Sequence, residues 1–137
     1  MNNWTCPKCK RVFQKKNQMH SCKVFPIEQH FKNKYLAKEV YKYLFNVINK
    51  KVGKCKEISL PCCIHWFGNY DFIALLPKKD KLEVRFSLNR KINSPRIFNN
   101  FPLSSKNYKV CLYIQNKEEV DEELLKWLKE SYALKSL

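Results

Sequence analysis

The sequence predicts an α+β fold in which a small N-terminal zinc knuckle precedes one compact domain. Three observations lead to this class: a cysteine and histidine motif in the first 23 residues, helical periodicity near both ends of the remaining chain, and four strand-like runs between them. The 137 residues suffice for one ordinary domain and a small appendage. We expect residues 1–23 to form the knuckle and residues 24–137 to form a four-stranded antiparallel sheet with two helices packed on one face.

The predicted knuckle contains Cys-Pro-Lys-Cys at residues 6–9 and, after ten intervening residues, His-Ser-Cys at residues 20–22. Two cysteines three residues apart reach one zinc ion from a single tight turn, and zinc takes four such ligands in a tetrahedron. We expect one structural zinc ion, with the ligands Cys6, Cys9, His20 and Cys22. His30 is the substitute if the geometry at His20 is strained. Four protein ligands leave no position for a catalytic water, so we expect no catalysis at this ion.

Residues 34–52 show the period of an amphipathic helix. Apolar side chains recur at intervals of three and four residues: Leu36, Val40, Tyr43, Leu44, Val47 and Ile48. Gly53 follows the last periodic residue, at the position where a left-handed C-cap is expected. The pattern therefore predicts one helix over residues 34–52 that ends at Gly53.

Four strand-like runs follow this helix, at residues 56–66, 70–76, 81–88 and 108–115. The run at 56–66 contains Pro61, which favours an edge strand or a bulge. The run at 81–88 alternates between apolar and polar residues, as in a half-buried strand. The Pro-Lys-Lys-Asp segment at 77–80 predicts a hairpin between the second and third runs. Residues 89–106 are predicted to form a long loop.

A second helix is predicted from about residue 118 to residue 134. Asn116 stands at the N-cap position and Glu119 follows three residues later, which is the pattern of a capping box. Apolar side chains recur along one face: Val120, Leu124, Trp127, Leu128 and Tyr132. The order of elements is helix, four strands, helix, and its simplest packing places both helices on one face of the sheet.

The formal net charge of +15 predicts attraction to polyanions. Most of the basic residues are lysines, however, and an AT-rich coding sequence produces such a composition without selection for binding. No apolar run of about eighteen residues is present, and the first eleven residues lack the apolar core of a signal peptide. Seven cysteines, an odd number, fit a reducing compartment better than a disulfide framework. We expect a cytoplasmic protein that does not enter a membrane.

Two groups of basic residues are candidates for contacts with nucleic-acid phosphates. The first group lies in the knuckle: Lys8, Lys10, Arg11, Lys15 and Lys16. The second group lies on the third strand and in the long loop: Arg85, Arg90, Lys91 and Arg96. Phe98 and Phe101 stand near the loop cations and would stack on bases, or would instead anchor the loop to the sheet. The knuckle cations have an alternative role, which is to offset the negative thiolate–zinc cluster.

The polar side of the predicted sheet is compatible with binding, with solvation or with metal chemistry. Lys81, Lys109 and Tyr113 would extend a nucleic-acid surface or simply face water. Asp71 and Glu83, with Arg85, stand on neighbouring strands, and acids so placed can share a divalent ion as in restriction-type nucleases. An arginine stands where those nucleases have a lysine, and a solvated strand has the same composition.

Cys63 and His65 lie two residues apart, so in a strand they share one face and would suit a nucleophile and its base. Cys62 would point to the opposite face and could not readily serve the same site. A cysteine buried in a β core is the commoner arrangement, and we expect it here.

The chain also resembles one bacterial family, the domain of unknown function catalogued as number 5655. The likeness covers nearly the whole chain and rests on the two knuckle motifs, His30-Phe31, the strand Leu82 to Leu88, Ser94-Pro95-Arg96-Ile97 and the ending from Val120 to Tyr132. The resemblance implies a small α+β domain and no established activity or catalytic residue. The family often has a histidine near the fourth strand, where this chain has Tyr108, Lys109 and Val110.

The function that these patterns favour is non-enzymatic binding of nucleic acid, DNA or RNA, mainly through phosphates. The resembled family also occurs at the C-termini of larger proteins, some labelled as predicted transport or restriction-related, and the second label implies an accessory role in DNA-related defence. The alternative is a module that binds a protein or a small ligand and in which zinc is purely structural. Salt dependence separates the two, because phosphate binding weakens steeply with salt and an apolar pocket does not respond in this way.

Overall fold

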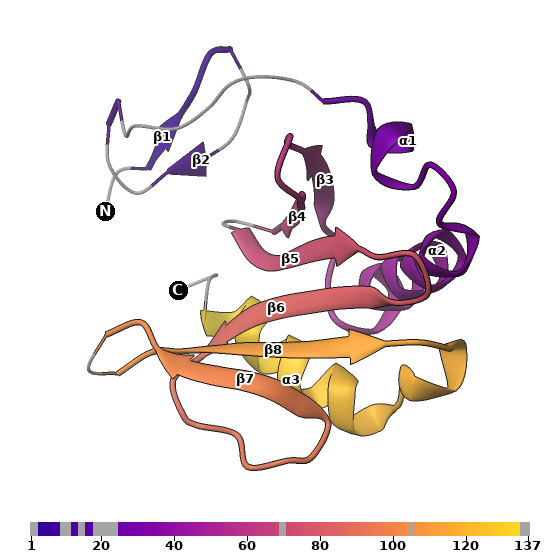
Figure 1. Ribbon diagram of the computed structural model, residues 1–137. Coiled ribbons are helices and arrows are strands. Elements are labelled where there is room, and N and C mark those ends of the chain that lie inside the picture. Colours follow the sequence, from indigo (N-terminus) through magenta and orange to yellow (C-terminus); the bar gives the residue numbers. More distant parts are fainter. Residues whose placement is uncertain are drawn as a thin grey trace.

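A computed structural model describes residues 3–8, 12–13, 16–17, 25–68, 71–104 and 106–134 (Figure 1). A short N-terminal hairpin joins β1 (Trp4–Thr5) to β2 (Val12–Phe13). Two helices follow, α1 (Ile27–His30) and α2 (Tyr35–Lys51). Then come the strands β3 (Lys56–Ser59), β4 (Ile64–Phe67), β5 (Asp71–Pro77), β6 (Leu82–Leu88), β7 (Ile97–Pro102) and β8 (Tyr108–Ile114). The chain continues into the 3-10 helix η1 (Lys117–Glu119) and the helix α3 (Glu122–Leu134).

Six strands of the described chain form one open antiparallel sheet in the order β3-β4-β5-β6-β8-β7, so the prediction of four strands was wrong. The run at 56–66 is two strands, because Pro61 lies in the tight turn between β3 and β4, where Leu60 N–H donates to the Cys63 carbonyl at 2.9 Å. Residues 89–106 are not all loop, since β7 pairs with β8 at the sheet edge. A bulge between Ile97 and Asn99 breaks the alternation of β7, and for this reason the pattern escaped detection.

The predicted strands 70–76, 81–88 and 108–115 are confirmed as β5, β6 and β8, and the predicted hairpin joins β5 to β6. Apolar residues on alternate positions meet across the sheet, as in the pairs Val84 with Leu112 and Phe86 with Val110. These side chains are almost fully buried with Leu44 of α2 and residues of α3 in one core. Both long helices therefore pack on the same sheet face, and in Figure 1 they lie behind the sheet.

Helix α2 confirms the helix predicted over residues 34–52, but the expected role of Gly53 was wrong. No described glycine has a positive φ, and the C-cap residue is Val52. Gly53 is small for a different reason: a Cβ built on it would lie 2.5 Å from Cζ of Tyr132, and one built on Gly68 would lie 2.7 Å from Cε2 of the same ring. The two glycines of the chain thus flank Tyr132, whose hydroxyl donates to the Lys54 carbonyl at 2.9 Å.

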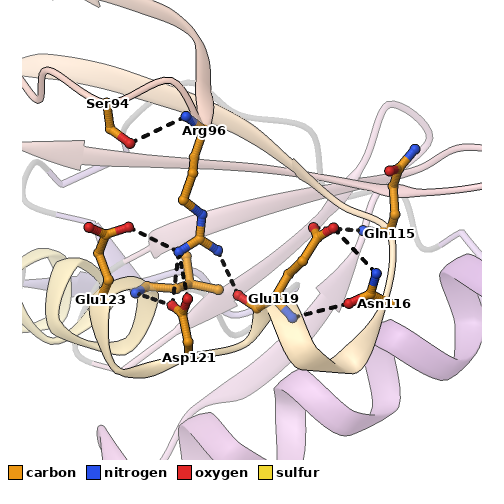
Figure 2. Close-up of polar contacts among 8 residues, drawn as sticks. Ser94, Arg96, Gln115, Asn116, Glu119, Asp121 and Glu123 are labelled. Carbon is orange, nitrogen blue, oxygen red and sulfur yellow. Dashed lines mark hydrogen bonds and ion pairs between the residues drawn. The ribbon is translucent and has the colours of Figure 1, made fainter.

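The C-terminal helix begins later than predicted. Asn116 accepts a hydrogen bond from Glu119 N–H at 3.2 Å, and the Glu119 carboxylate accepts one from Gln115 N–H at 3.1 Å. The predicted N-cap at Asn116 is therefore present, but it caps η1 and not α3, and Glu119 bonds back to Gln115 and not to the N–H of Asn116 (Figure 2). Asp121 caps α3 in its place, because its side chain accepts from Leu124 N–H at 3.0 Å.

Candidate nucleic-acid interface

The sheet has one face turned away from α2 and α3, which we term the open face. None of the described helices packs on it. His65, Ala74, Arg85 and Cys111 are successive partners across β4, β5, β6 and β8 on this face. Tyr113 of β8 lies opposite Glu83 of β6, one step further along the same face. The alternation of the strands thus brings together polar, basic and aromatic side chains that are far apart in the sequence.

An aromatic pair lies on the open face near the edge strand β7. The rings of Phe98 and Tyr113 are stacked, with their centroids 4.2 Å apart and their planes 10° apart. The Lys81 ammonium lies 4.3 Å from the centroid of the Tyr113 ring. Phe98 anchors β7 to the sheet, and it still exposes 46% of its surface, while Phe101 exposes 36%. Both predicted roles of Phe98 are therefore compatible with the structure.

Arg85 pairs with Glu83, which the sequence pattern had suggested would be exposed to solvent. Glu83 is only 3% exposed, and its Oε2 accepts a hydrogen bond from Arg85 Nε at 2.5 Å. Partial burial opposes the charge of Arg85, but the hydrogen bond and charge of Glu83 outweigh it and raise the pKa of Arg85 above its ordinary value. Among the described residues, Lys81 and Lys109 form no ion pair. The two lysines are therefore the more available cations of this face.

Arg96 forms a network with the N-terminal end of the last helix (Figure 2). Its guanidinium donates to Asp121 at 2.8 and 3.0 Å, to Glu123 at 3.1 Å and to the Glu119 carbonyl at 2.6 Å. It also lies over the Trp127 ring, 5.8 Å from the centroid. Burial opposes the charge, but the hydrogen bonds to the two carboxylates raise the pKa of Arg96. This arginine braces the start of β7 against α3, so its guanidinium is already satisfied within the protein.

Arg90 and Lys91 precede this network and differ in their contacts. Arg90 makes a bidentate pair with Glu130, at 3.1 and 2.8 Å, and half of its side chain is exposed. Lys91 is exposed and has no ion pair with a described residue. A phosphate that bound Arg90 or Arg96 would thus compete with an ion pair inside the protein. A phosphate that bound Lys91 would meet no such competition from the described residues.

The turn before β4 brings three side chains into one line. Cys63 Sγ lies 3.1 Å from His65 Nε2, and His65 Nδ1 lies 3.6 Å from Asp71 Oδ2. Cys62 Sγ lies 3.1 Å from Cys63 Sγ, so the expectation that the two cysteines serve different faces was wrong. Both cysteines precede the first residue of β4, and the alternation of a strand does not apply to them.

This line resembles a nucleophile, a base and an orienting acid, but the thiol is not activated. Burial, followed by the neighbouring Cys62, raises the pKa of Cys63 to about 12, although Lys109 and Arg85 act in the opposite direction. At neutral pH the thiol is therefore protonated, and the protonated thiol is a poor nucleophile. The residues form a polar cluster at one end of the open face, beside a pocket of about 120 Å³ that His65, Asp71 and Arg85 line.

Asp71 and Glu83 do not form the carboxylate pair that a nuclease needs. Glu83 lies opposite Leu76, which is five residues from Asp71 along β5. At about 3.3 Å per residue the two positions are roughly 16 Å apart. This separation is too large for one shared divalent ion, whose oxygen ligands lie at about 2.0–2.6 Å. The described residues contain no cluster of three or more metal-ligating side chains.

Most of the predicted zinc site lies outside the described residues. Cys6 is described and is 3% exposed, next to the β1–β2 hairpin. The other predicted ligands, Cys9, His20 and Cys22, lie outside. His30 donates from Nε2 to the Leu60 carbonyl at 2.8 Å, so this nitrogen is occupied in the compact domain.

Of the basic residues predicted in the knuckle, some are described and others are not. Lys8 and Lys16 are exposed. Lys10, Arg11 and Lys15 lie outside the described residues.

Sequence reasoning missed one further site, a pocket of about 470 Å³ between α1, α2 and β3. Tyr41 donates to Glu57 there and accepts a hydrogen bond from Trp66. No motif links these residues, because the contact depends on how β3 and β4 pack beside α2. The only signal was the presence of several aromatic residues in the helix, and aromatic side chains are normally read as core.

Comparison with known proteins bears on the compact domain. Among the described helices, none combines the length with the apolar composition that a membrane-spanning helix requires. No curated protein and no solved structure matches the chain. Residues 27–135, which are more than half of the chain and include every helix and the whole six-stranded sheet, match the family model described as Domain of unknown function (DUF5655). The chain therefore belongs to the DUF5655 family.

Proposed function

We propose that this protein binds single-stranded nucleic acid on the open face of its sheet. The binding surface is the aromatic–basic stripe, which we define as Lys81, Phe98, Phe101, Lys109 and Tyr113. The observation that supports it best is the stacked pair Phe98–Tyr113 with an ammonium group 4.3 Å from the Tyr113 ring. An exposed aromatic ring offers a platform for a base, and a lysine beside it pairs with the adjoining phosphate.

The arrangement favours a single strand over a duplex. Bases in a duplex are stacked on one another, and only an unstacked base can lie on an aromatic side chain. A sheet face on which none of the described helices packs gives an extended chain room to cross several strands, and aromatic residues on a sheet are a known means of holding bases. The net charge of +15 adds a long-range attraction that brings any polyanion to the surface.

The zinc knuckle is part of this proposal. One zinc ion held by Cys6, Cys9, His20 and Cys22 would stabilise a unit too small to fold on its own apolar surface. Lys8 and Lys16, both exposed, would then add phosphate contacts from a rigid support. The burial of Cys6 beside a short hairpin fits a ligand in such a unit.

The test is a titration of labelled single strands of about ten nucleotides, DNA and RNA, with duplexes of the same sequence, by fluorescence anisotropy at several salt concentrations. Phe98→Ala removes the exposed ring of the stacked pair, and the loss of one stacked base costs about 1–3 kcal/mol, or roughly 5- to 150-fold in affinity. The variant Lys81→Gln/Lys109→Gln should reduce the salt slope by about 1.4, since each phosphate contact on a single strand contributes about 0.7.

The matched control is Lys126→Gln/Lys129→Gln, which removes the same charge from exposed positions on α3. The control should weaken binding much less than the stripe variant. Equal losses from the two lysine pairs, or full binding by Phe98→Ala, would show that only the overall charge attracts the nucleic acid and would refute the proposal.

A further inference from the structure

A second candidate binding site lies away from the open face, in the pocket of about 470 Å³ between α1, α2 and β3. Pockets for small ligands have volumes of about 300–1,000 Å³ and combine apolar walls with a few convergent polar groups. The walls here include the aromatic residues Phe31, Tyr41 and Phe45. Figure 1 shows α1 and α2 at the same end of the molecule, on the side of the sheet edge that β3 forms.

The aromatic side chains of the pocket are held in a fixed arrangement. The rings of Tyr41 and Phe45, one turn apart on α2, are parallel within 2° with their centroids 6.4 Å apart. The ring of Phe31 packs against that of Tyr41 with the centroids 4.9 Å apart, and the ring of Phe45 packs edge-on against that of Trp66 with the centroids 5.1 Å apart. Trp66 is completely buried, so it anchors this group to the core. Phe31 and Tyr41 are 8% and 4% exposed, whereas Phe45 is only half-buried, so Phe45 offers most of the aromatic surface for a planar ligand.

A chain of hydrogen bonds leads from the core to a carboxylate in the pocket. The buried Trp66 donates from Nε1 to the Tyr41 hydroxyl at 2.8 Å, and that hydroxyl donates to Oε2 of Glu57. Burial, followed by the hydrogen bond to Glu57, raises the pKa of Tyr41 far above its ordinary value, so the hydroxyl remains a donor. Glu57 is itself exposed, and its Oε1 accepts no hydrogen bond from the described residues. The carboxylate is thus oriented from one side and has capacity for donors from a ligand.

Two lysines and a second, exposed carboxylate, Glu28, also line the pocket. Lys38 and Lys42 are exposed, and with Asn46 they follow the i, i+4, i+8 spacing along one face of α2. The ligand that matches all of these groups is planar, has N–H donors on one edge and carries an anion at its other end. An organic cation would satisfy the carboxylate, but the field of a chain with net charge +15 opposes its approach and favours an anion.

We propose that this pocket binds a nucleoside monophosphate, with the base against Phe45, an N–H edge on Glu57 and the phosphate near Lys38 and Lys42. Guanine fits the carboxylate best, because its N1–H and N2–H groups are adjacent donors that can meet two carboxylate oxygens. The residues of this pocket are separate from the aromatic–basic stripe, so failure of either proposal leaves the other intact.

The experiment is a calorimetric titration of the full chain with GMP, AMP, CMP and UMP, accompanied by amide NMR spectra. GMP should bind more tightly than the other three nucleotides and should shift amides near Phe31, Phe45 and Glu57. Glu57→Gln keeps the shape but removes the charge, and should weaken GMP binding about 10- to 100-fold, the effect of losing hydrogen bonds to a charged group. The control Glu39→Gln removes the same charge from an exposed position of α2 outside the pocket and should leave the affinity unchanged.

Two further measurements keep the result decisive. Phe45→Leu tests the aromatic wall without touching the polar chain, and circular dichroism checks that each variant is folded. Inorganic phosphate alone should bind at least tenfold more weakly than GMP. Absence of GMP-induced shifts in the pocket at millimolar ligand, equal affinities of Glu57→Gln and Glu39→Gln, or phosphate binding as tight as GMP binding would each overturn the proposal.

Discussion

The two glycines of this chain should be intolerant of even one added methyl group, although neither has a positive φ. A Cβ on Gly53 would lie 2.5 Å from Tyr132 Cζ, and a Cβ on Gly68 would lie 2.7 Å from Tyr132 Cε2. Carbon atoms in van der Waals contact are about 3.5–4.0 Å apart, so each methyl group would overlap the ring by about 1 Å. Because a glycine flanks each edge of the ring, the ring cannot move away from one without approaching the other.

The cost follows from two opposing effects. Overpacking of this size typically costs about 1–3 kcal/mol. Replacement of glycine by alanine also restricts the unfolded chain, which stabilises the protein by about 0.4–1 kcal/mol. We therefore expect Gly53→Ala and Gly68→Ala each to lower the free energy of unfolding by about 1–2 kcal/mol, measured by urea denaturation with circular dichroism.

A double-mutant cycle shows whether the ring is the cause. Tyr132→Ala removes the ring, and with it the edge-on contact to Phe72 and the hydrogen bond to the Lys54 carbonyl, so it destabilises on its own. In that background Gly53→Ala meets no ring and should be neutral or slightly stabilising. If Gly53→Ala costs the same with and without the ring, or costs nothing with the ring present, the steric reasoning is refuted.

Three further predictions concern the ion pairs, the thiols and the metal. Arg96→Gln should lower the free energy of unfolding by about 1–2 kcal/mol, because it removes a guanidinium that bonds two half-exposed carboxylates and the Glu119 carbonyl. Arg90→Gln, which loses one half-exposed ion pair, should cost about 0–1 kcal/mol, and equal shifts in thermal unfolding would contradict this difference. With a pKa of about 12 for Cys63, its rate of alkylation should rise about tenfold per pH unit from pH 7 to pH 10, because the thiolate fraction rises in the same proportion. The rate is measured by mass spectrometry after timed alkylation, and a rate that is already constant near neutral pH would show that the pKa of Cys63 is not raised. Elemental analysis should find one zinc ion per chain, lost in Cys6→Ser and retained in Cys62→Ser; retention in both variants would rule out the predicted ligand set.

Local patterns were sufficient for the elements whose side chains alternate without interruption. Residues 81–88 and the helix over 34–52 each follow one period from end to end, so the prediction and the structure agree within a residue or two. The prediction failed where one residue breaks the period. Pro61 turned a single predicted strand into a hairpin, and the bulge after Ile97 hid an edge strand. Edge strands also carry weak patterns because only part of each is buried.

The candidate sites were predictable only to the extent that they consist of neighbours along one strand. Cys63 and His65 do meet, with sulfur and ring nitrogen 3.1 Å apart, although Cys63 precedes β4 and the strand alternation from which the pairing was argued does not reach it. The pairing of Tyr41 with Glu57 spans sixteen residues and two elements, and no periodicity encodes it. The engagement of Arg96 with Asp121 was equally invisible, because a sequence shows that a charge is present and not which opposite charge lies beside it.

By itself, the sequence determined the α+β class, the existence and direction of the main elements, the strongly basic character of the chain and the motif of a predicted zinc knuckle. These properties follow from side-chain periodicity, composition and short spacing, all of which are local. The tertiary structure alone decided that the sheet has six strands, that its open face gathers a stacked aromatic pair with available lysines, and that three arginines are bound to acids. Packing brings together residues that are distant along the chain, and the energy of a charge or an aromatic ring depends on those neighbours more than on its place in the sequence.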